Sequence, residues 1–296
     1  MKRILVTGAN GFIGRETIAP LMARGFDVHT VGRSPPDHDG CHDHRCDLIN
    51  GDVGGLIADI APSHLLHLAW YAVPGKFWTA PENLDWVAAS LRLVGAFARA
   101  GGVRATVAGS CAEYDWSEPM LDDRTTVLQP ATLYGISKLA LFRMLQAAAS
   151  AIGIELGWGR VFFPFGPREQ SGRLLSDVID GVAAGRRVPC SDGLQQRDFM
   201  HVEDVGAAFA ALADSNVNGA VNIASGTSVA VRELVMAAAA LAGDVRLIDW
   251  GARPRQADEP ETMVATIARL HNEVGFRPRW DLQNGVANAV ARRLAA

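Results

Sequence analysis

The first half of the chain alternates short aliphatic runs with longer stretches in which apolar residues recur at helical spacing. The aliphatic runs predict strands at residues 3–7, 27–32, 64–69, 105–109 and 155–162. The periodic stretches predict helices at residues 12–24, 85–100 and 134–149. Such alternation is typical of a parallel sheet with helices on both faces. We therefore expect an α/β fold of the Rossmann type, with a doubly wound parallel sheet.

The second half of the chain is less regular and predicts a smaller, mixed α/β lobe. Helices are expected at residues 174–185 and 231–242, and strands at residues 221–223 and 245–249. The two parts are expected to interleave along the chain. Residues 1–163 and about 198–225 would form a dinucleotide-binding domain, and about 164–197 and 226–296 a substrate-binding lobe.

Composition excludes several classes of protein. Hydrophobic residues make up 49% of the 296 residues, enough for a large core, and a formal net charge of −4 gives no reason to expect nucleic-acid binding. No apolar run approaches the roughly 20 residues that span a membrane. The N-terminus enters a predicted strand without a signal peptide, so a cytoplasmic protein with no membrane partner is the simplest expectation.

Four scattered cysteines do not suggest a disulfide framework. The segment 38–46, HDGCHDHRC, gathers thiols and imidazoles that could ligate zinc. Its spacing fits none of the usual zinc patterns, and a segment rich in glycine and aspartate suits a solvated loop. We therefore expect a loop here and no bound metal.

A glycine-rich turn, TGANGFIG at residues 7–14, follows the first predicted strand. Gly8 would permit a tight turn, Gly11 would let the backbone approach a pyrophosphate, and Gly14 would allow close packing of helix on strand. Free N–H groups at the start of the helix would hold the phosphates. The contacts expected in this turn are Gly8, Asn10, Gly11, Phe12, Ile13 and Gly14.

The end of the second predicted strand bears on the choice of cofactor. NAD sites usually place an acidic residue there, but this chain has Gly32, Arg33 and Ser34. An arginine can pair with a 2′-phosphate, so we predict NADP, with NAD possible; the alternative is that Arg33 is a solvated surface residue. Asp47 and Leu48 are expected to reach the adenine. Two further cofactor contacts are expected at the end of the strand at residues 64–69: Leu68 and Ala69.

Tyr134 and Lys138 lie four residues apart on a predicted helix and therefore share a face. A cation there would stabilise phenolate and lower a pKa that is ordinarily about 10. Taken alone, the pair fits an ordinary amphipathic helix equally well. Ser110 follows a predicted strand and would lie at the edge where open α/β sheets bind ligands.

Together, these motifs resemble the extended short-chain dehydrogenase/reductase family, in its branch of nucleotide-sugar epimerases, dehydratases and ketoreductases. The resemblance continues through RVFFPFGP at 160–167, QRDFMHVEDV at 196–205 and NIASG at 222–226. It implies that Tyr134 is the general acid/base and that Ser110 bonds the reacting oxygen. It also implies that Lys138 lowers the pKa of Tyr134 and holds the nicotinamide ribose.

The same resemblance implies a nucleotide-diphosphate sugar as substrate. Arg197 and Arg255 match positions that contact the diphosphate, and Arg253 could take the place of Arg255. Arg197 could instead form a surface ion pair with Asp198 or Glu203. Three residues are expected near the sugar: Glu113, Tyr114 and Arg173. The alternatives are that Glu113 is a loop carboxylate and that the Tyr114 ring only packs.

Departures from the family pattern narrow the reaction. Dehydratases of this branch place Asp-Glu directly after the hydroxyl residue, where this chain has Cys111 and Ala112. The 3,5-epimerase/reductases need a cysteine at the position of Ala112 and a histidine near Arg173. We therefore predict an NADP-dependent reductase of a 4-keto-6-deoxy nucleotide sugar. The alternatives are an NAD(P)-dependent 4-epimerase and a catalytically silent NADP-sensing scaffold.

The resemblance also bears on assembly. The family's equivalents of the helices at 85–100 and 134–149 form a four-helix dimer interface, which implies a homodimer. Alternatively, these are ordinary helices that pack on the sheet of a monomer.

Overall fold

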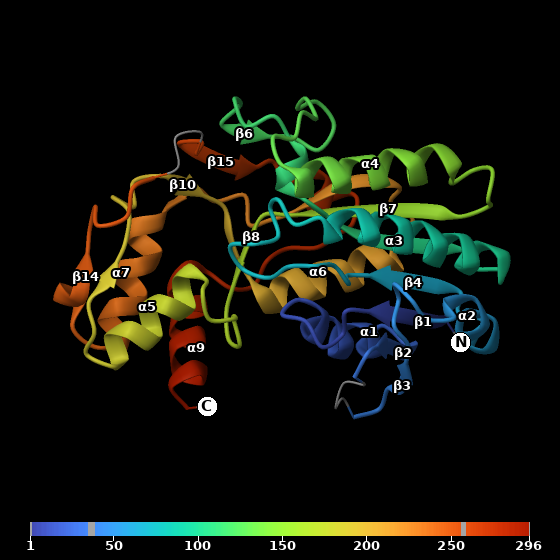
Figure 1. The fold of residues 1–296 in the computed structure, drawn as a ribbon, viewed down its shortest axis with the longest axis horizontal. Helices are drawn as coiled ribbons and strands as arrows, with labels where there is room; N and C mark the ends of the chain where they lie inside the picture. Colours follow the sequence, from blue (N-terminus) through green and yellow to red (C-terminus); the bar gives the residue numbers. More distant parts are fainter. Residues whose placement is uncertain (1, 35–38, 256–258, 296) are drawn as a thin grey trace.

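The computed structural model describes residues 2–34, 39–255 and 259–295. At its centre lies a seven-stranded sheet in the order β12-β7-β5-β4-β1-β2-β3, and all its neighbouring strands are parallel. Figure 1 shows this sheet on the right of the molecule. Its strands are β1 (Lys2–Thr7), β2 (Phe26–Gly32), β3 (His42–Arg45), β4 (His64–His67), β5 (Arg104–Ser110), β7 (Glu155–Val161) and β12 (Gly219–Ile223).

The central strands are apolar on both sides because helices cover both faces of the sheet. One face packs against α2 (Val53–Ile60), α3 (Glu82–Arg99) and α4 (Leu133–Ala148). The other face packs against α1 (Ile18–Ala23), α6 (Val202–Asp214) and the short α8 (Ala268–Asn272). The order of the strands reverses between β1 and β4, and such a switch point is where doubly wound sheets bind ligands. The predicted Rossmann-type fold is confirmed.

The smaller lobe has its own core. It contains α5 (Leu174–Ala183), α7 (Val231–Ala242) and α9 (Leu282–Leu294), which Figure 1 shows on the left. The strand pair β9 (Val188–Pro189) and β14 (Ile248–Asp249) lies in this lobe. A small mixed sheet joins β6 (Met120–Leu121), β10 (Gln196–Arg197), β13 (Val229–Ala230) and β15 (Thr262–Ala265). A second pair joins β8 (Phe163–Phe165) and β11 (Phe199–His201).

Several predicted elements need correction. The first helix begins as a 3-10 turn, η1 (Gly14–Thr17), and residues 245–249 form a 3-10 turn, η3 (Val245–Leu247), before the two-residue β14. The segment 38–46, expected to be a loop, contains β3. This strand is the edge of the sheet, with a neighbouring strand on one side only, so it forms without apolar residues. His38, in the same segment, lies outside the described residues.

The lobe boundary also differs in one place. Residues 267–276 were expected in the substrate lobe, but Leu270 and Phe276 belong to the core beneath α1 and α6. The chain therefore returns to the nucleotide domain before it forms α9. None of the helices in the described part of the chain has the length and hydropathy that a membrane span requires.

Candidate active site

The glycine turn after β1 has the shape that a bound pyrophosphate requires. Gly8 has a φ of +73°, and a Cβ there would lie 2.8 Å from the Ala69 nitrogen. A Cβ on Gly14 would lie 2.0 Å from the Gly8 oxygen, so neither glycine tolerates a side chain. The Gly11 N–H donates to the same oxygen at 2.9 Å and closes the turn. This cradle fits a dinucleotide. Asn10, Phe12 and Ile13 would offer their backbone groups to it.

A buried chain of hydrogen bonds fixes the strands that carry this turn. Thr7 Oγ1 lies 2.7 Å from His67 Nδ1, and His67 Nε2 lies 2.8 Å from Ser90 Oγ. The N–H groups of Leu68 and Ala69 both donate to Thr7 Oγ1 at 3.2 Å, so any cofactor contact from these two residues must use other atoms. Burial lowers the pKa of His67 to about 3, so its imidazole is a neutral bridge. Sequence reasoning missed this bridge because a lone histidine in a strand gives no functional signal.

The residues expected at the adenosine end lie beyond β2 and β3. Arg33 and Ser34 are exposed, and the Ser34 carbonyl accepts from Asn10 Nδ2 at 2.7 Å, which ties β2 to the glycine turn. Asp47 Oδ1 accepts from a backbone N–H two residues on at 2.9 Å, and this bond lowers the pKa of its carboxyl. The Leu48 side chain packs in the core, so only its backbone is available to a ligand.

Ser110 and Tyr134 are brought together because α4 lies close against the turn that follows β5. Ser110 ends β5, and Tyr134 lies in the first turn of α4, whose start is capped by Thr132. A Cβ on Gly135 would lie 2.2 Å from the Ala112 oxygen, so only glycine lets α4 approach the turn after β5 this closely. The Ser110 hydroxyl is within hydrogen-bonding reach of the Tyr134 phenol and counters part of the pKa shift described next.

The pKa of Tyr134 is raised above its ordinary value. Burial is the largest cause, opposed by the hydrogen bond from Ser110 and by the charge of Arg173. In the ligand-free protein burial outweighs the groups that lower this pKa, and the expected lowering by Lys138 stays a prediction. Tyr134 is a protonated phenol at neutral pH.

Lys138 follows one turn later on α4 and is almost completely buried. Its ammonium donates to the Ala108 carbonyl of β5 at 2.8 Å and lies 3.7 Å from the centre of a Trp70 ring. The same nitrogen lies 5.9 Å from the centre of the Tyr134 ring. Burial lowers the pKa of Lys138 to about 7, so this amine is poised between its two protonation states.

An aromatic wall surrounds the Tyr134 ring. It consists of Trp70, Phe77 and Trp78, whose ring centres lie 6.5, 4.9 and 5.8 Å from that of Tyr134, all edge to face. Buried Asn83 holds this loop in place, because it accepts from Trp70 Nε1 at 2.8 Å and donates to the Phe77 carbonyl at 2.8 Å. A hollow of about 370 Å³ lies nearby, lined in part by Trp116, Gln129 and Pro260. The wall, which we did not foresee, packs against the ring of Tyr134 and leaves the residue half-buried.

Glu113 does not face a ligand, which corrects the sequence-based expectation. Its side chain is 0% exposed, and it accepts from Arg160 Nε at 2.8 Å. It also accepts from the Ser110 N–H at 2.8 Å and from Trp158 Nε1 at 2.9 Å. A carboxylate held by three donors in the core positions Ser110 and takes no part in binding sugar.

Tyr114 is corrected in the same way. Its side chain is buried, and its hydroxyl accepts from Arg160 Nη1 at 3.0 Å and donates to Asn222 Oδ1 at 2.7 Å. Because that hydroxyl is fully used, Tyr114 offers no polar group to a sugar, although it does border the hollow of about 370 Å³. We call the group Glu113, Tyr114, Trp158, Arg160 and Asn222 the buried network.

Cys111 and Ala112 give the site no acid–base helpers. Burial raises the pKa of the Cys111 thiol to about 12, so it stays protonated at neutral pH. Ala112 offers only a methyl group. The adjacent carboxylate, Glu113, is locked in the buried network.

The structure brings the two expected diphosphate ligands together. Arg255 lies close enough for its charge to act on Arg197. Both arginines pair with carboxylates of the segment 259–261. Arg197 is 5% exposed and pairs with Glu259 at 2.6 Å, so it does not form the alternative surface pair with Asp198 or Glu203. Arg255 pairs at 2.8 Å with an exposed carboxylate, that of Glu261.

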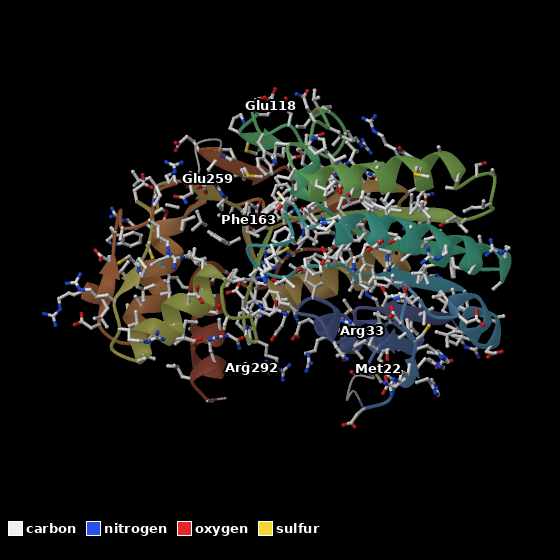
Figure 2. All side chains as sticks on the ribbon, viewed as in Figure 1. Met22, Arg33, Glu118, Phe163, Glu259 and Arg292 are labelled. Atoms are coloured by element: carbon white, nitrogen blue, oxygen red, sulfur yellow. The ribbon has the colours of Figure 1, made fainter. Side chains whose placement is uncertain are left out.

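Arg197 also borders the reaction centre. It lies over the Phe163 ring, with 5.5 Å between its Cζ and the ring centre, and its charge reaches Cys111. Figure 2 labels Phe163 and Glu259 close to the junction with the smaller lobe, while Arg33 is labelled lower, in the nucleotide domain. Arg173 approaches from the start of α5, near enough for its charge to act on Tyr134. We call Ser110, Tyr134, Lys138, Arg173 and Arg197 the open face.

Buried Asp198 joins three segments beneath this face. Its carboxylate accepts from the N–H and hydroxyl of Ser225, both at 2.7 Å, from the Gly226 N–H at 2.9 Å and from the Ala265 N–H at 3.1 Å. It therefore fixes the direction in which Arg197 leaves the backbone. Sequence reasoning treated Asp198 only as a surface partner, because its backbone partners are far away along the chain.

Comparisons with known proteins agree with this geometry. The chain is 28% identical to a UDP-glucose 4-epimerase of Corynebacterium glutamicum, over 98% of this chain and 95% of that protein. It is 27% identical to a GDP-6-deoxy-D-mannose reductase of Pseudomonas aeruginosa, over 96% and 95% of the two chains. The solved structure of MoeE5 in complex with UDP-glucuronic acid and NAD superposes with a TM-score of 0.86 at 30% identity, covering 99% of both chains. Residues 4–224 match the model of the NAD dependent epimerase/dehydratase family, and this chain belongs to that family.

Proposed function

We propose that this protein uses NADPH to reduce the 4-keto group of a 4-keto-6-deoxy nucleotide sugar. The observation that carries the proposal is Arg33, exposed at the end of β2 where NAD sites place a carboxylate. It favours NADPH, which a reductase uses up, whereas a 4-epimerase retains its NAD throughout. Tyr134 stands beside Ser110 with its phenol protonated, ready to give the proton that the new alkoxide needs.

The residues of the open face have separate tasks in this proposal. Ser110 and Tyr134 bond the keto oxygen, and Tyr134 donates its proton as that oxygen becomes an alkoxide. Lys138 donates from its ammonium to the nicotinamide ribose and keeps the ring beside the sugar. The bound cofactor supplies the hydride, so carbonyl, hydride and proton together give the alcohol.

The surroundings of Ser110 support a reaction with one proton relay. Dehydration needs an acid and a base that act on neighbouring carbons. Cys111 stays a thiol and Glu113 is held by Arg160, so neither is suited to that task. The second candidate, a 4-epimerase, uses the same three residues and is favoured by the kinship with the corynebacterial enzyme.

A direct assay separates the candidates. Purified protein is incubated with NADPH and a panel of 4-keto-6-deoxy nucleotide sugars with different bases, and cofactor absorbance is followed. Oxidation of NADPH with formation of the 6-deoxy sugar supports the proposal. Interconversion of nucleotide hexoses without net change in cofactor would instead establish the epimerase, and cofactor binding without any turnover the silent scaffold.

The preference for NADP is proposed from Arg33, which lies exposed at the end of β2 where NAD sites place a carboxylate. Arg33→Asp should lower the NADPH/NADH ratio of kcat/KM by about tenfold or more, because one charge-assisted hydrogen bond is worth about 1.5–3 kcal/mol. Steady-state kinetics with both cofactors measures this ratio. Arg99→Asp, the same change in the last turn of α3, should leave it within about twofold; an equal effect of both would remove Arg33 as the cause.

A nucleotide-diphosphate sugar is the proposed substrate because Arg197 and Arg255 lie together beside the open face. Their present partners, Glu259 and Glu261, are both partly exposed and can give way to a diphosphate. Phe163 stands where the family usually has an asparagine that holds the nucleotide. The base is therefore left open in the proposal.

We also propose a homodimer through α3 and α4, which lie side by side on one face of the sheet. Both helices expose large apolar side chains that their own subunit does not cover: Leu84, Ile136 and Met144. Light scattering should give twice the monomer mass, and Ile136→Glu together with Met144→Glu should give the monomer. A cytoplasmic location stays a prediction.

A further inference from the structure

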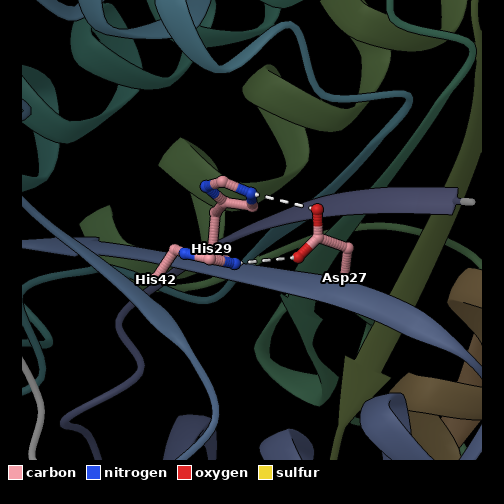
Figure 3. Close-up of side chains that lie close together, drawn as sticks. All are labelled: Asp27, His29 and His42. Carbon is pink, nitrogen blue, oxygen red and sulfur yellow. Dashed lines mark hydrogen bonds and ion pairs between the residues drawn. The ribbon is translucent and has the colours of Figure 1, made fainter.

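A cluster of imidazoles lies at the edge of the sheet, outside the active site. β3 is the edge strand and pairs in parallel with β2, so that His42 stands opposite His29. Asp27 lies two residues before His29 and therefore points to the same face of the sheet. Figure 3 shows both imidazoles directed at the Asp27 carboxylate.

The spacing of these groups suits a small divalent cation. His42 Nε2 lies 3.2 Å from Asp27 Oδ1, and His29 Nε2 lies 3.4 Å from Asp27 Oδ2. One ligand atom from each of the three residues lies within 4.8 Å of the others. Ligands about 2.1 Å from a tetrahedral ion stand roughly 3.4 Å apart, so the cluster needs little rearrangement to close around one.

A fourth residue orients the ligands. His29 Nδ1 lies 2.9 Å from His44 Nε2, and the two rings are stacked. When the N–H sits on His29 Nδ1 and donates to His44, the lone pair of His29 Nε2 is free to bind a metal. Metal-ligating histidines usually donate their other N–H to such a partner, which fixes the tautomer.

The cluster is also accessible. The Asp27 and His29 side chains are 16% and 11% exposed, whereas that of His42 is 63% exposed and leaves one side open to solvent. An ion can enter from that side and keep a water as its fourth ligand. Arg3 Nε lies 3.3 Å from Asp27 Oδ2 and takes up part of the carboxylate charge.

From these contacts we propose that Asp27, His29 and His42 form a binding site for Zn²⁺ or a similar transition-metal ion. Two neutral imidazoles and one carboxylate suit such ions, whereas Ca²⁺ and Mg²⁺ require more oxygen ligands. The site joins the edge strand β3 to β2. Asp27 and His29 lie in the amino-terminal half of β2, away from Gly32 and the cofactor end, so the ion is structural and does not take part in turnover.

A zinc titration tests the site. It uses the full-length protein after removal of any affinity tag and of bound metal with a chelator. Calorimetry should give one equivalent of Zn²⁺, and one equivalent of Co²⁺ should give a visible absorption band of low-symmetry coordination. Zn²⁺ should also raise the melting temperature. Absence of saturable binding of either ion would overturn the proposal.

Variants assign the ligands. His42→Ala removes the exposed ligand and should weaken Zn²⁺ binding by more than the about 10–100-fold expected for loss of an orienting residue, which is the effect expected of His44→Ala. Asp27→Asn keeps the shape of the side chain and should also abolish the Co²⁺ band. His271→Ala, in α8, is the matched control and should bind Zn²⁺ as the parent does. Unchanged binding in His42→Ala, or equal loss in His271→Ala, would show that the ion lies elsewhere.

Discussion

The buried network and the open face use the same kinds of residue to different ends, although they meet at Ser110. In the buried network, Arg160 and Glu113 are 1% and 0% exposed, and every oxygen of the carboxylate is engaged. On the open face, Arg197 is 5% exposed, but its partner Glu259 is 26% exposed and reaches solvent. An arginine whose partner can leave is able to accept a ligand, whereas one that is enclosed with its partner only supports the fold. Between these two arginines, the exposure of the partner, more than that of the arginine itself, separates the one that can meet a ligand from the one enclosed in the core.

The largest effect expected from this comparison is on the open face. Tyr134→Phe should lower kcat by about a thousandfold, because general acid catalysis contributes about 10²–10⁴. Cofactor affinity and melting temperature should stay close to the parent values, since the ring and its aromatic neighbours remain. Single-turnover kinetics with NADPH measures the loss, and retained activity would remove Tyr134 from the proton relay.

Removal of a charge from the buried network should instead lower stability. Glu113→Gln leaves the Arg160 charge uncompensated in the core and should cost about 3–5 kcal/mol in the free energy of unfolding. Urea denaturation measures this cost. The control is Glu155→Gln, which breaks a pair with buried Arg104 on the same sheet; since the Glu155 side chain is 45% exposed, its loss should cost about 1 kcal/mol or less. Equal costs for the two variants would contradict the distinction by partner exposure.

Arg197→Ala should act on substrate binding. Loss of a charge-assisted contact to the diphosphate should raise KM for the nucleotide sugar by about tenfold or more, with a smaller effect on kcat. Initial-rate kinetics separates the two constants. Arg187→Ala removes an exposed arginine of the smaller lobe, paired with Asp249, and should leave KM unchanged.

The smallest expected effect is the uptake of a proton by Lys138 when the cofactor binds. The pKa of Lys138 is about 7 in the free protein, below the ordinary 10.5. Ribose oxygens and phosphates favour the ammonium form, so cofactor binding raises this pKa. At pH 8 binding should take up close to one proton, and at pH 6 almost none, because the amine is already charged there.

Calorimetry in buffers of different ionisation enthalpy measures that uptake. Glu169 also has a pKa of about 7, raised by burial, and could contribute to it. Lys138→Met should therefore abolish the uptake, while Glu169→Gln should leave it. Equal heats in all buffers at pH 8 would contradict the poised amine.

Most of the nucleotide domain could be predicted because its strands are buried on both faces and appear as uninterrupted aliphatic runs. β3 could not, because its sequence, HDHR, carries no apolar residue and forms an edge. The helices α2, α6 and α9 were also not anticipated. Residue order shows which stretches are amphipathic, but tertiary packing decides which of them form helices.

The site shows the same limit. Position in a motif selected Ser110, Tyr134 and Lys138, and the structure brings these three residues together; their catalytic roles stay a proposal. Motif position did not show which way a side chain points, so Glu113 was assigned to the sugar. Its partner Arg160 comes 47 residues later in the chain, and the pairing is visible only in the folded structure. The histidine cluster was hidden for the same reason: His42 lies in the segment considered for zinc, but its partners Asp27 and His29 come from another strand.

The contact between Lys138 and Trp70 has an optical consequence. The emission of an indole depends on charge beside its ring, and here the ammonium lies 3.7 Å from a ring centre. A ribose that draws this ammonium away changes the electric field at Trp70, while Asn83 keeps the indole itself in place. With Lys138 in its proposed role, Trp70 would act as a built-in fluorescent reporter of cofactor arrival, once its emission is separated from that of the other six of the seven tryptophans by Trp70→Phe.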